Sequence, residues 1–570
     1  MHHQSQQPLE PNPPGAPGSS SSTPAIAAGS PNIGASTGSP GAISRAAGAI
    51  TSGRWSRRNV LGGSMALGVG AALTACGGPA PNQLATPTGQ PQHGGTLRIG
   101  LAGGGAADTL DAHIPVSTTD IARVVSLYES LLYRDENFEL KPLLATRATP
   151  SSDAKTWTVE LRKDVKFHDG RPMTGRDVAA TFARITDPDD PKSGASGLGI
   201  LDNVVVINDH LVEFRLNTPV ATFDDSIGQY AMGIVPEDYD PAKPIGTGPF
   251  KAESFTPGQR SVFSRNEHYW LDNLPYLDEL MILNFDDSDA MINALLSTQV
   301  DAIGQIPLAL LEVLDTDPRI DILNSETGMW MPFTMRVDKK PFDDVRVRQA
   351  FRYAVDREQM IEQVLSGNGT VGNDLYAPFD PGYAEKLPQR KQDIKKAKQL
   401  LAEAGYPDGL DVELVTAPIQ AGAVSAAQVF AQQAKDAGIN VNIRRVDTTT
   451  FFGENYLEWT FAQDFWYTRN FLPQANNCAL PDSPFNETHF NNQKFIALYH
   501  EARSTTDDKA RNKLIAEAQT LEYNEGGYII WGFSNQADAY QRYVAGLVPN
   551  RTGLALSGFD FRRVWLGGRA

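Results

Sequence analysis

Strand-like runs and amphipathic helical segments alternate along the chain from residue 94 onward, and this alternation constrains the fold more than any other feature. Residues 156–162 (TWTVELR) and 210–217 (HLVEFRLN) alternate apolar and polar side chains, with the period of a half-buried strand. Strands and helices mixed over about 470 residues indicate α/β or α+β domains. We find no internal repeat in the sequence.

Capping residues predict where several helices begin and end. Asp343 or Asp344 can accept hydrogen bonds at the start of one helix. Asp356 and Gln359 have the spacing of a capping box and predict the start of a second helix directly after it. A third helix, within KKAKQLLAEAGYPDG, is predicted to end at Gly405.

Length and charge limit the classes of protein to which the chain can belong. With 570 residues, it is too long for one hydrophobic core, so two or more domains are expected. Hydrophobic residues make up 41% and charged residues 21%, as in ordinary soluble proteins. Beyond residue 75, 46 basic side chains stand against 66 acidic ones, a balance of about −20. Nucleic acid is therefore not an expected partner, and an anionic bilayer is a poor one.

The amino-terminal part has the character of an export segment. Residues 1–55 are rich in Pro, Gly, Ser and Ala and are expected to be a disordered preface. In residues 56–75, Arg57 and Arg58 precede an apolar run of sixteen residues. This run is shorter than the roughly 20 residues that span a bilayer, and its order of charged, apolar and small residues is typical of a signal peptide. A buried helix rich in Gly and Ala is the alternative.

Two short motifs make the export signal more specific. SRRNVL (56–61) resembles the twin-arginine export signal, and LTAC (73–76) resembles the lipobox, in which the thiol of Cys76 receives a diacylglycerol. Residues 76–94 are then the lipidated cysteine and a flexible linker. The predicted product is exported and attached by this lipid alone to the outer face of the cytoplasmic membrane. Cys478 has no partner for an intramolecular disulfide.

A search for catalytic motifs finds no convincing candidate. The sequence contains no phosphate-binding loop with its lysine, no H-E-x-x-H zinc pair and no G-x-S-x-G nucleophile turn. Ser152 and Lys155 have an S-x-x-K spacing, but they lie in a polar turn instead of at the start of an apolar helix. We therefore predict that the chain is not an enzyme and needs no cofactor.

Four segments resemble the family 5 extracellular solute-binding proteins, the peptide- and nickel-binding components of ABC importers. The resemblance is specific, follows the family's order and covers about residues 95–550. It is carried by 128–188 (YESLLYRDENFELKPLLATRATPSS and onward), 244–270 (PIGTGPFKAESFTPGQRSVFSRNEHYW), 340–361 (KPFDDVRVRQAFRYAVDREQMI) and 396–409 (KAKQLLAEAGYPDG).

The resemblance implies an α/β, two-lobe periplasmic-binding-protein-like fold with mixed sheets flanked by helices. Lobe I would comprise residues 95–327, with an inserted subdomain at about 134–243, and would be completed by 534–570. Lobe II would comprise 328–533, with hinge crossings near 328–333 and 529–533. Such a monomer would close around its ligand, and closure would strengthen the few polar contacts left inside.

The resemblance also places ligand contacts in FAQDFWYTRNFL (461–472). In peptide-binding relatives an aspartate of this segment pairs with the α-ammonium group of the ligand. Asp464 takes that position, and Phe461 takes the place of the aromatic residue before it. A carboxylate in a dry cleft makes a strong charge-assisted hydrogen bond to an ammonium group.

The chain departs from the family pattern directly after Asp464. Trp466, Tyr467 and Arg469 occur where small, acidic and proline residues are usual. The two aromatic side chains could stack on a ring or a sugar, and Arg469 could hold a ligand carboxylate. The same aromatic residues could instead belong to the core.

Two further candidates lie in HIPVSTTD (113–120), a loop that contacts ligand in relatives. Ser117 and Thr118 could donate hydrogen bonds to a ligand, or they could cap the helix that follows. His489 is a lone histidine, so we predict no metal site.

The predicted function is that of a lipid-anchored binding protein that captures a peptide or related small organic solute and delivers it to an ABC permease. An oligosaccharide or opine-like ligand in the same fold is the first alternative. A surface peptide receptor or chaperone without transport is the second, and a peptide hydrolase is the weakest.

Overall fold

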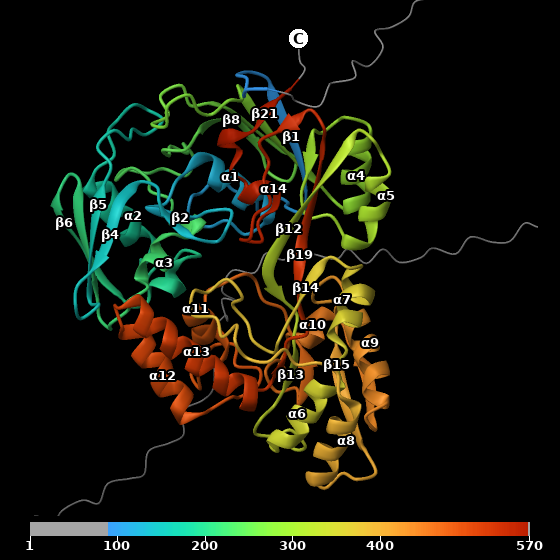
Figure 1. Ribbon diagram of the computed structural model, residues 1–570. Coiled ribbons are helices and arrows are strands. Elements are labelled where there is room, and N and C mark those ends of the chain that lie inside the picture. Colours follow the sequence, from blue (N-terminus) through green and yellow to red (C-terminus); the bar gives the residue numbers. More distant parts are fainter. Residues whose placement is uncertain (1–88, 568–570) are drawn as a thin grey trace, which may run out of the picture.

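The computed structural model describes residues 89–567, which form two lobes (Figure 1). Two long strands, β12 (Ile320–Trp330) and β19 (Gly532–Gln541), run side by side from the upper lobe toward the lower one. Mixed sheets flanked by helices confirm the predicted α/β class. The predicted preface, signal segment and Cys76 lie outside the described residues, and the exact domain limits stay predictions.

An eight-stranded sheet forms the centre of the upper lobe. Its strand order is β12-β19-β11-β1-β10-β9-β8, and β14 pairs with β19. β1 is parallel to its neighbours β10 and β11, whereas β19 is antiparallel to β11 and β12. The sheet therefore joins strands from both ends of the chain. Its remaining strands are β1 (Thr96–Ala102), β8 (Phe250–Thr256), β9 (Arg260–Arg265), β10 (Glu279–Phe285), β11 (Ala302–Ile303) and β14 (Gly369–Val371).

Helices cover this sheet because each presents one apolar face to it. Ile121 and Val124 of α1 (Thr118–Leu127) join the core formed by Leu97 and Ile99 of β1, which are fully buried. The other elements of this region are α4 (Ser288–Leu296), α5 (Leu311–Asp315), α14 (Ala555–Gly558), β20 (Val544–Ala545) and β21 (Trp565–Leu566).

A separate four-stranded antiparallel sheet, with the order β4-β5-β7-β6, lies beside the large sheet. Both strands predicted from alternating hydrophobicity are confirmed, as β5 (Thr156–Leu161) and β7 (Leu211–Leu216). Trp157, Phe182 and Phe214 form its core. The neighbouring elements are β2 (Leu132–Arg134), β3 (Leu140–Pro142), β4 (Ala145–Pro150), β6 (Leu201–Asn208), α2 (Gly175–Ile185) and α3 (Phe223–Ile227).

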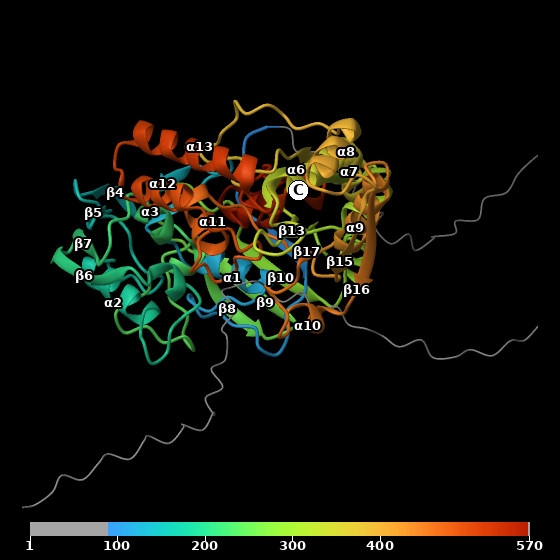
Figure 2. The same cartoon turned by 90° about the horizontal axis from the view of Figure 1, so that it is seen from below.

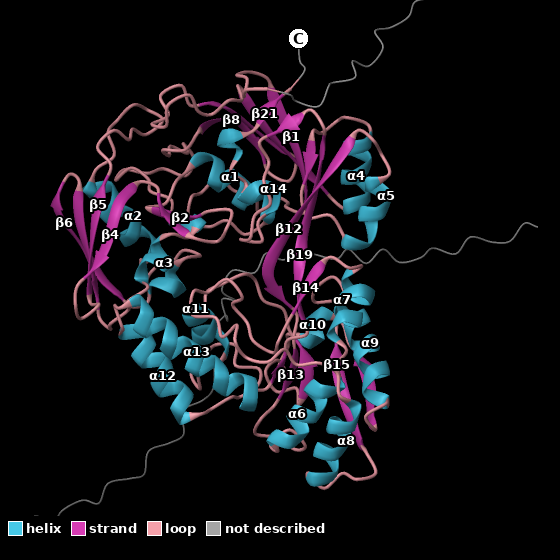
Figure 3. Ribbon diagram, in the orientation of Figure 1, coloured by secondary structure: helices cyan, strands magenta, loops and turns pink. Residues whose placement is uncertain are grey.

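The lower lobe contains two small sheets with helices around them (Figure 3). One sheet has the order β17-β13-β18, and the other pairs β15 with β16 in parallel. The strands are β13 (Phe333–Met335), β15 (Leu410–Thr416), β16 (Ile439–Arg445), β17 (Phe461–Gln463) and β18 (Tyr528–Ile529). The helices are α6 (Val345–Ala354), α7 (Arg357–Leu365), α8 (Ile394–Glu403), α9 (Ala423–Lys435), α10 (Thr448–Phe451), α11 (Phe471–Cys478), α12 (Gln493–Ser504) and α13 (Asp508–Glu525).

The predicted helix starts in this lobe are confirmed. Asp344 caps α6 by accepting from the Arg346 N–H, which decides between the two aspartates that the sequence allowed. Asp356 caps α7 by accepting from the Gln359 N–H at 3.0 Å. Gly405, with φ 98°, follows the end of α8 in the left-handed region, where a side chain would be strained.

The two lobes touch at several points besides the long strands. Asn470 of the lower lobe donates to Asp225 of α3 at 3.0 Å, and the Ala221 N–H donates to the carbonyl of Arg503 in α12 at 2.7 Å. Figures 1 and 2 both place α12 next to α3. The described conformation therefore has the lobes in contact.

Candidate functional site

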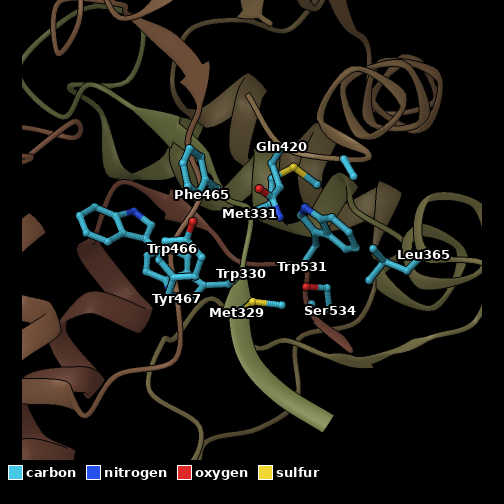
Figure 4. A pocket seen from close by; sticks show the side chains of 12 residues that line it. Met329, Trp330, Met331, Leu365, Gln420, Phe465, Trp466, Tyr467, Trp531 and Ser534 are labelled. Atoms are coloured by element: carbon cyan, nitrogen blue, oxygen red, sulfur yellow. The ribbon is translucent and has the colours of Figure 1, made fainter. Parts of the chain in front are cut away.

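A small cavity lies where β12 and β19 reach the lower lobe (Figure 4). It encloses about 30 Å³, which is room for roughly two water molecules. The lining residues are Met329, Trp330, Met331, Leu365, Gln420, Ala421, Phe465, Trp466, Tyr467, Trp531, Gly532 and Ser534.

The segment after Asp464 forms one wall of this cavity because it pairs with the end of β12. Trp330 and Trp466 form an antiparallel bridge, with hydrogen bonds of 3.0 and 2.9 Å between their backbones. The two indole rings stack with centroids 6.0 Å apart. Trp466 is only 7% exposed, so much of its ring belongs to the core of the lower lobe. This core role is the alternative that the sequence had left open.

Phe465 and Tyr467 are the more accessible aromatic residues of the segment. Both are half-buried, and their rings meet edge to face with centroids 5.9 Å apart. Figure 4 shows them on one side of the cavity and Trp531 with Leu365 on the other. These side chains can offer apolar contact surface to a ligand between the lobes.

Arg469 is a half-buried cation beside this wall. Its Cζ lies 5.7 Å from the ring centroid of Trp466, and its Nη1 is 3.5 Å from Oε1 of Gln474. Within residues 89–567 it forms no salt bridge, and burial lowers the pKa of its guanidinium. Its electrostatic neighbours include Tyr467 and, from the upper lobe, Tyr230. Arg469 therefore has unused capacity to bind an anion.

Asp464 points into a second, smaller cavity inside the lower lobe. It is 4% exposed and lines this cavity together with Thr334, Tyr456 and Glu487. The Tyr456 hydroxyl donates to Oδ2 at 2.9 Å, and the Phe465 N–H donates to Oδ1 at 2.7 Å. Burial raises the pKa of the Asp464 carboxyl group above its usual range.

The remaining predicted residues lie apart from these cavities. Phe461 is 1% exposed and packs against Phe333, Phe342 and Phe351 in the core, so its side chain has a packing role in this conformation. Ser117 accepts from the Asp120 N–H as the N-cap of α1, which is the structural role that the sequence also allowed.

Thr118 donates to Oε1 of Gln305 at 3.1 Å in the upper lobe. It does not line either cavity. A ligand contact for Ser117 or Thr118 therefore stays a prediction.

Glu487 is the residue of the site that sequence reasoning missed. It lies in a polar segment (NETHF, with His489), and nothing in that pattern indicates that the glutamate is buried. Its burial results from the packing of this loop against Tyr528 of β18, whose hydroxyl donates to it.

Residues 89–567 show neither a metal site nor a membrane-spanning helix. That part of the chain contains no group of three or more His, Cys, Asp or Glu side chains arranged to hold a metal ion. Nor does any helix in it have the length and apolar character needed to cross a membrane.

Comparison with known proteins identifies the family. Residues 139–483 match the bacterial extracellular solute-binding proteins, family 5 Middle. Heme-binding protein A of Haemophilus influenzae is 28% identical over 70% of this chain and 79% of that protein. The dipeptide-binding protein of Escherichia coli is 27% identical over 76% of this chain and 89% of that protein.

Solved structures show the same fold. The PBP AgaA from A. tumefaciens R10, in complex with agropinic acid, has 26% identity and a TM-score of 0.67 over 84% of this chain and 99% of that chain. HbpA2 from Haemophilus parasuis has 23% identity and a TM-score of 0.74 over 83% of this chain and all of that chain. The predicted two-lobe periplasmic-binding-protein fold is thereby confirmed.

The family match covers more than half of the chain and agrees with the resemblance read from the four sequence segments. Proteins of this family are exported, non-enzymatic binding components of ABC importers. The chain belongs to the family 5 bacterial extracellular solute-binding proteins.

Proposed function

We propose that this protein captures a peptide, or a related small organic solute with a free amino group, between its two lobes and delivers it to an ABC permease. The observation that carries the proposal is the Asp464 carboxyl group. It is buried, lines a cavity, and has no basic neighbour in the described part of the chain. A ligand ammonium group is the natural counter-ion for such a carboxylate.

Titration calorimetry with a panel of short peptides tests this function. We expect Asp464→Asn to weaken a peptide ligand by about 2 to 5 kcal/mol, as for a buried charged partner that is removed. Asp482→Asn, an exposed aspartate of the same lobe, is the matched control and should bind normally. An unchanged affinity in Asp464→Asn would refute the assignment of this residue.

An opine-like ligand or an oligosaccharide is the second candidate, and Arg469 with its aromatic neighbours favours it. The half-buried guanidinium has no salt bridge in the described residues, so it suits a carboxylate-bearing solute. The solved relative AgaA is in complex with agropinic acid, which is a precedent in the same fold. A sugar should bind equally well to the wild-type protein and to Asp464→Asn, whereas a peptide should not.

The site of action follows from the amino-terminal motifs. We place the protein on the outer face of the cytoplasmic membrane as a monomer, exported through Arg57 and Arg58 and held by a lipid on Cys76. Replacing both arginines with lysine should block export. Cys76→Ala should release a soluble protein that still binds its ligand. Normal export of the double-lysine variant would refute the twin-arginine assignment and leave the lipid anchor to be judged from Cys76→Ala.

A further inference from the structure

Two buried carboxyl groups meet beside the smaller cavity. Asp464 and Glu487 are each 4% exposed, and both line it. Tyr456 and Phe465 donate hydrogen bonds to Asp464, and Tyr528 donates to Oε2 of Glu487. The other oxygen, Oε1 of Glu487, is buried and has no hydrogen-bond partner in the described structure. It is an open acceptor at the wall of a cavity.

The surroundings of the pair contain no cation that could balance two negative charges. The ionisable groups that face it are Tyr456, Tyr528 and Cys478, all of which burial keeps neutral by raising their pKa values. Within residues 89–567, neither Asp464 nor Glu487 forms a salt bridge with an arginine, lysine or histidine.

Two carboxylates cannot both stay ionised in such a dry site. Burial first, and then the charge of Asp464, raises the pKa of Glu487 well above its usual range. Both side chains line the same small cavity, and a proton held by the pair relieves the repulsion between their charges. The pair therefore carries a net charge of −1 when it holds one proton.

We infer that Asp464 and Glu487 share one proton in the unliganded protein, and that the primary ammonium group of a ligand displaces this proton to solvent when it binds. The inference rests on the proposed peptide function and adds Glu487 to its site. The singly protonated pair and R–NH₃⁺ combine to give two carboxylates bridged by R–NH₃⁺ and one H⁺ in solution.

The size and the acceptors of the cavity favour a primary ammonium group over other cations. The cavity holds about 10 Å³, close to the space of one water molecule. An –NH₃⁺ group is about that size and brings three N–H donors, whereas a guanidinium group is larger and planar. Asp464 and Glu487 both line the cavity, and Oε1 of Glu487 has no hydrogen-bond partner in the described structure, so the pair offers acceptors for these donors. No third metal-binding side chain joins the pair in the described residues, which disfavours a divalent metal.

Proton release makes binding depend on pH. Below the pKa of the pair, peptide affinity should rise by up to tenfold for each pH unit, because one proton leaves for each ligand bound. Above that pKa the affinity should level off. In Glu487→Gln, the side-chain amide keeps a hydrogen-bond donor permanently at the position of the shared proton. The affinity of this variant for peptides should therefore be weaker than that of the wild-type protein, and it should not depend on pH below the pKa of the pair.

Calorimetry with trialanine at pH 5.5, in buffers of different ionisation enthalpy, measures the protons released. We expect nearly one proton per peptide for the wild-type protein and for Glu501→Gln, an exposed glutamate of α12 that serves as the matched control. Glu487→Gln should release none. N-acetyl-trialanine, which lacks the ammonium group, should bind without proton release or not at all.

Denaturation of the ligand-free proteins supplies an independent measurement. Because the folded pair holds its proton more tightly than the unfolded chain, the wild-type protein should lose stability as the pH rises above about 4.3, the ordinary pKa of glutamate. Its unfolding equilibrium constant should increase by up to tenfold for each pH unit relative to that of Glu487→Gln.

The outcomes separate the inference from the function on which it rests. Tight trialanine binding without proton release, or equal release by Glu487→Gln, would overturn the inference and leave the peptide function intact. No binding of any peptide would overturn the peptide function and the release step. In that case, parallel pH profiles of unfolding for wild type and Glu487→Gln would overturn the shared proton as well.

Discussion

Two fully buried aspartates of the lower lobe have opposite surroundings. Asp374 accepts from Arg357 at 2.7 and 2.8 Å, also pairs with Arg390, and lies 4.0 Å from Arg352. Asp464 has only a tyrosine hydroxyl and a backbone N–H, with Glu487 beside it. The fold thus supplies three cations to one carboxylate and none to the other.

The pKa values follow this contrast. Burial alone would raise the pKa of Asp374, but Arg357 and Arg390 outweigh burial and hold the pKa below its usual range. Burial raises the pKa of Asp464 without such compensation. A buried charge that is paired internally holds a fold together, whereas one that is left unpaired is available to a ligand.

The largest expected effect comes from removing the paired carboxylate. Asp374→Asn leaves the surrounding arginines without their counter-ion and should lower the free energy of unfolding by about 3 to 5 kcal/mol, measured by urea denaturation at pH 7. Asp464→Asn is the control and should lose no more than about 1 kcal/mol. Equal losses in the two variants would remove the distinction between a structural and a ligand-binding aspartate.

A pH effect at Glu522 tests whether other unpaired carboxyl groups behave like the pair at the cavity. Burial raises the pKa of Glu522 to about 8, although Tyr376 donates to it at 2.9 Å. Since the folded pKa is raised, its stabilising contribution is complete below about pH 4.3 and is lost as the pH rises toward 8. The loss should be up to about 1.4 kcal/mol for each pH unit.

Glu522→Gln should abolish this loss, which thermal or urea unfolding between pH 5 and 8 would show. Glu517→Gln, a more exposed glutamate of the same helix α13, is the matched control and should retain the wild-type profile. If Glu522→Gln also retained it, the carboxyl group would not be protonated in the folded state.

A smaller effect is expected at the contact between the lobes. Asn470→Ala removes the hydrogen bond to Asp225, which lies on the opposite lobe. The closed form should lose about 1 kcal/mol, so ligand affinity should fall roughly fivefold while urea stability changes little. Small-angle scattering of the unliganded variant should show a larger radius of gyration. An unchanged radius and affinity would mean that this contact does not hold the lobes together.

The smallest expected effect concerns the neutral partner of Asp464. Tyr456→Phe removes the hydroxyl that donates to Oδ2 and should cost about 0.5 kcal/mol of peptide affinity, the low end for a single hydrogen bond, because the carboxylate loses one donor that favours its charged form. Calorimetry at pH 7 measures it, with Tyr406→Phe of the same lobe as the control. A loss as large as that of Asp464→Asn would mean that Tyr456 itself contacts the ligand.

Local patterns in the sequence predicted much of the scaffold. The two alternating segments are strands β5 and β7, and Asp344 and Asp356 begin helices as expected. Such features depend on residues within a few positions of one another, so they can be read directly from the chain.

The candidate site was predicted less completely. Its segment and its central aspartate came from the family resemblance, and Asp464 does line a cavity. The sequence could not tell that Trp466 stacks on Trp330 or that Phe461 is a core residue, because an aromatic side chain serves a core and a ligand equally well. It also could not show that Glu487 lies beside Asp464, 23 positions away.

By itself, the sequence determined the family, the α/β class, the non-enzymatic character and a few helix and strand boundaries, because periodicity, capping and family motifs are local properties. Only the tertiary structure decided which buried charges are balanced. The residues next to Asp374 and next to Asp464 in the sequence are a mixture of polar and apolar side chains, so they do not distinguish the two aspartates. Packing brings arginines to Asp374, and it brings the carboxyl group of Glu487 to Asp464. Charge balance in a dry interior depends on distances in space, which no local pattern records.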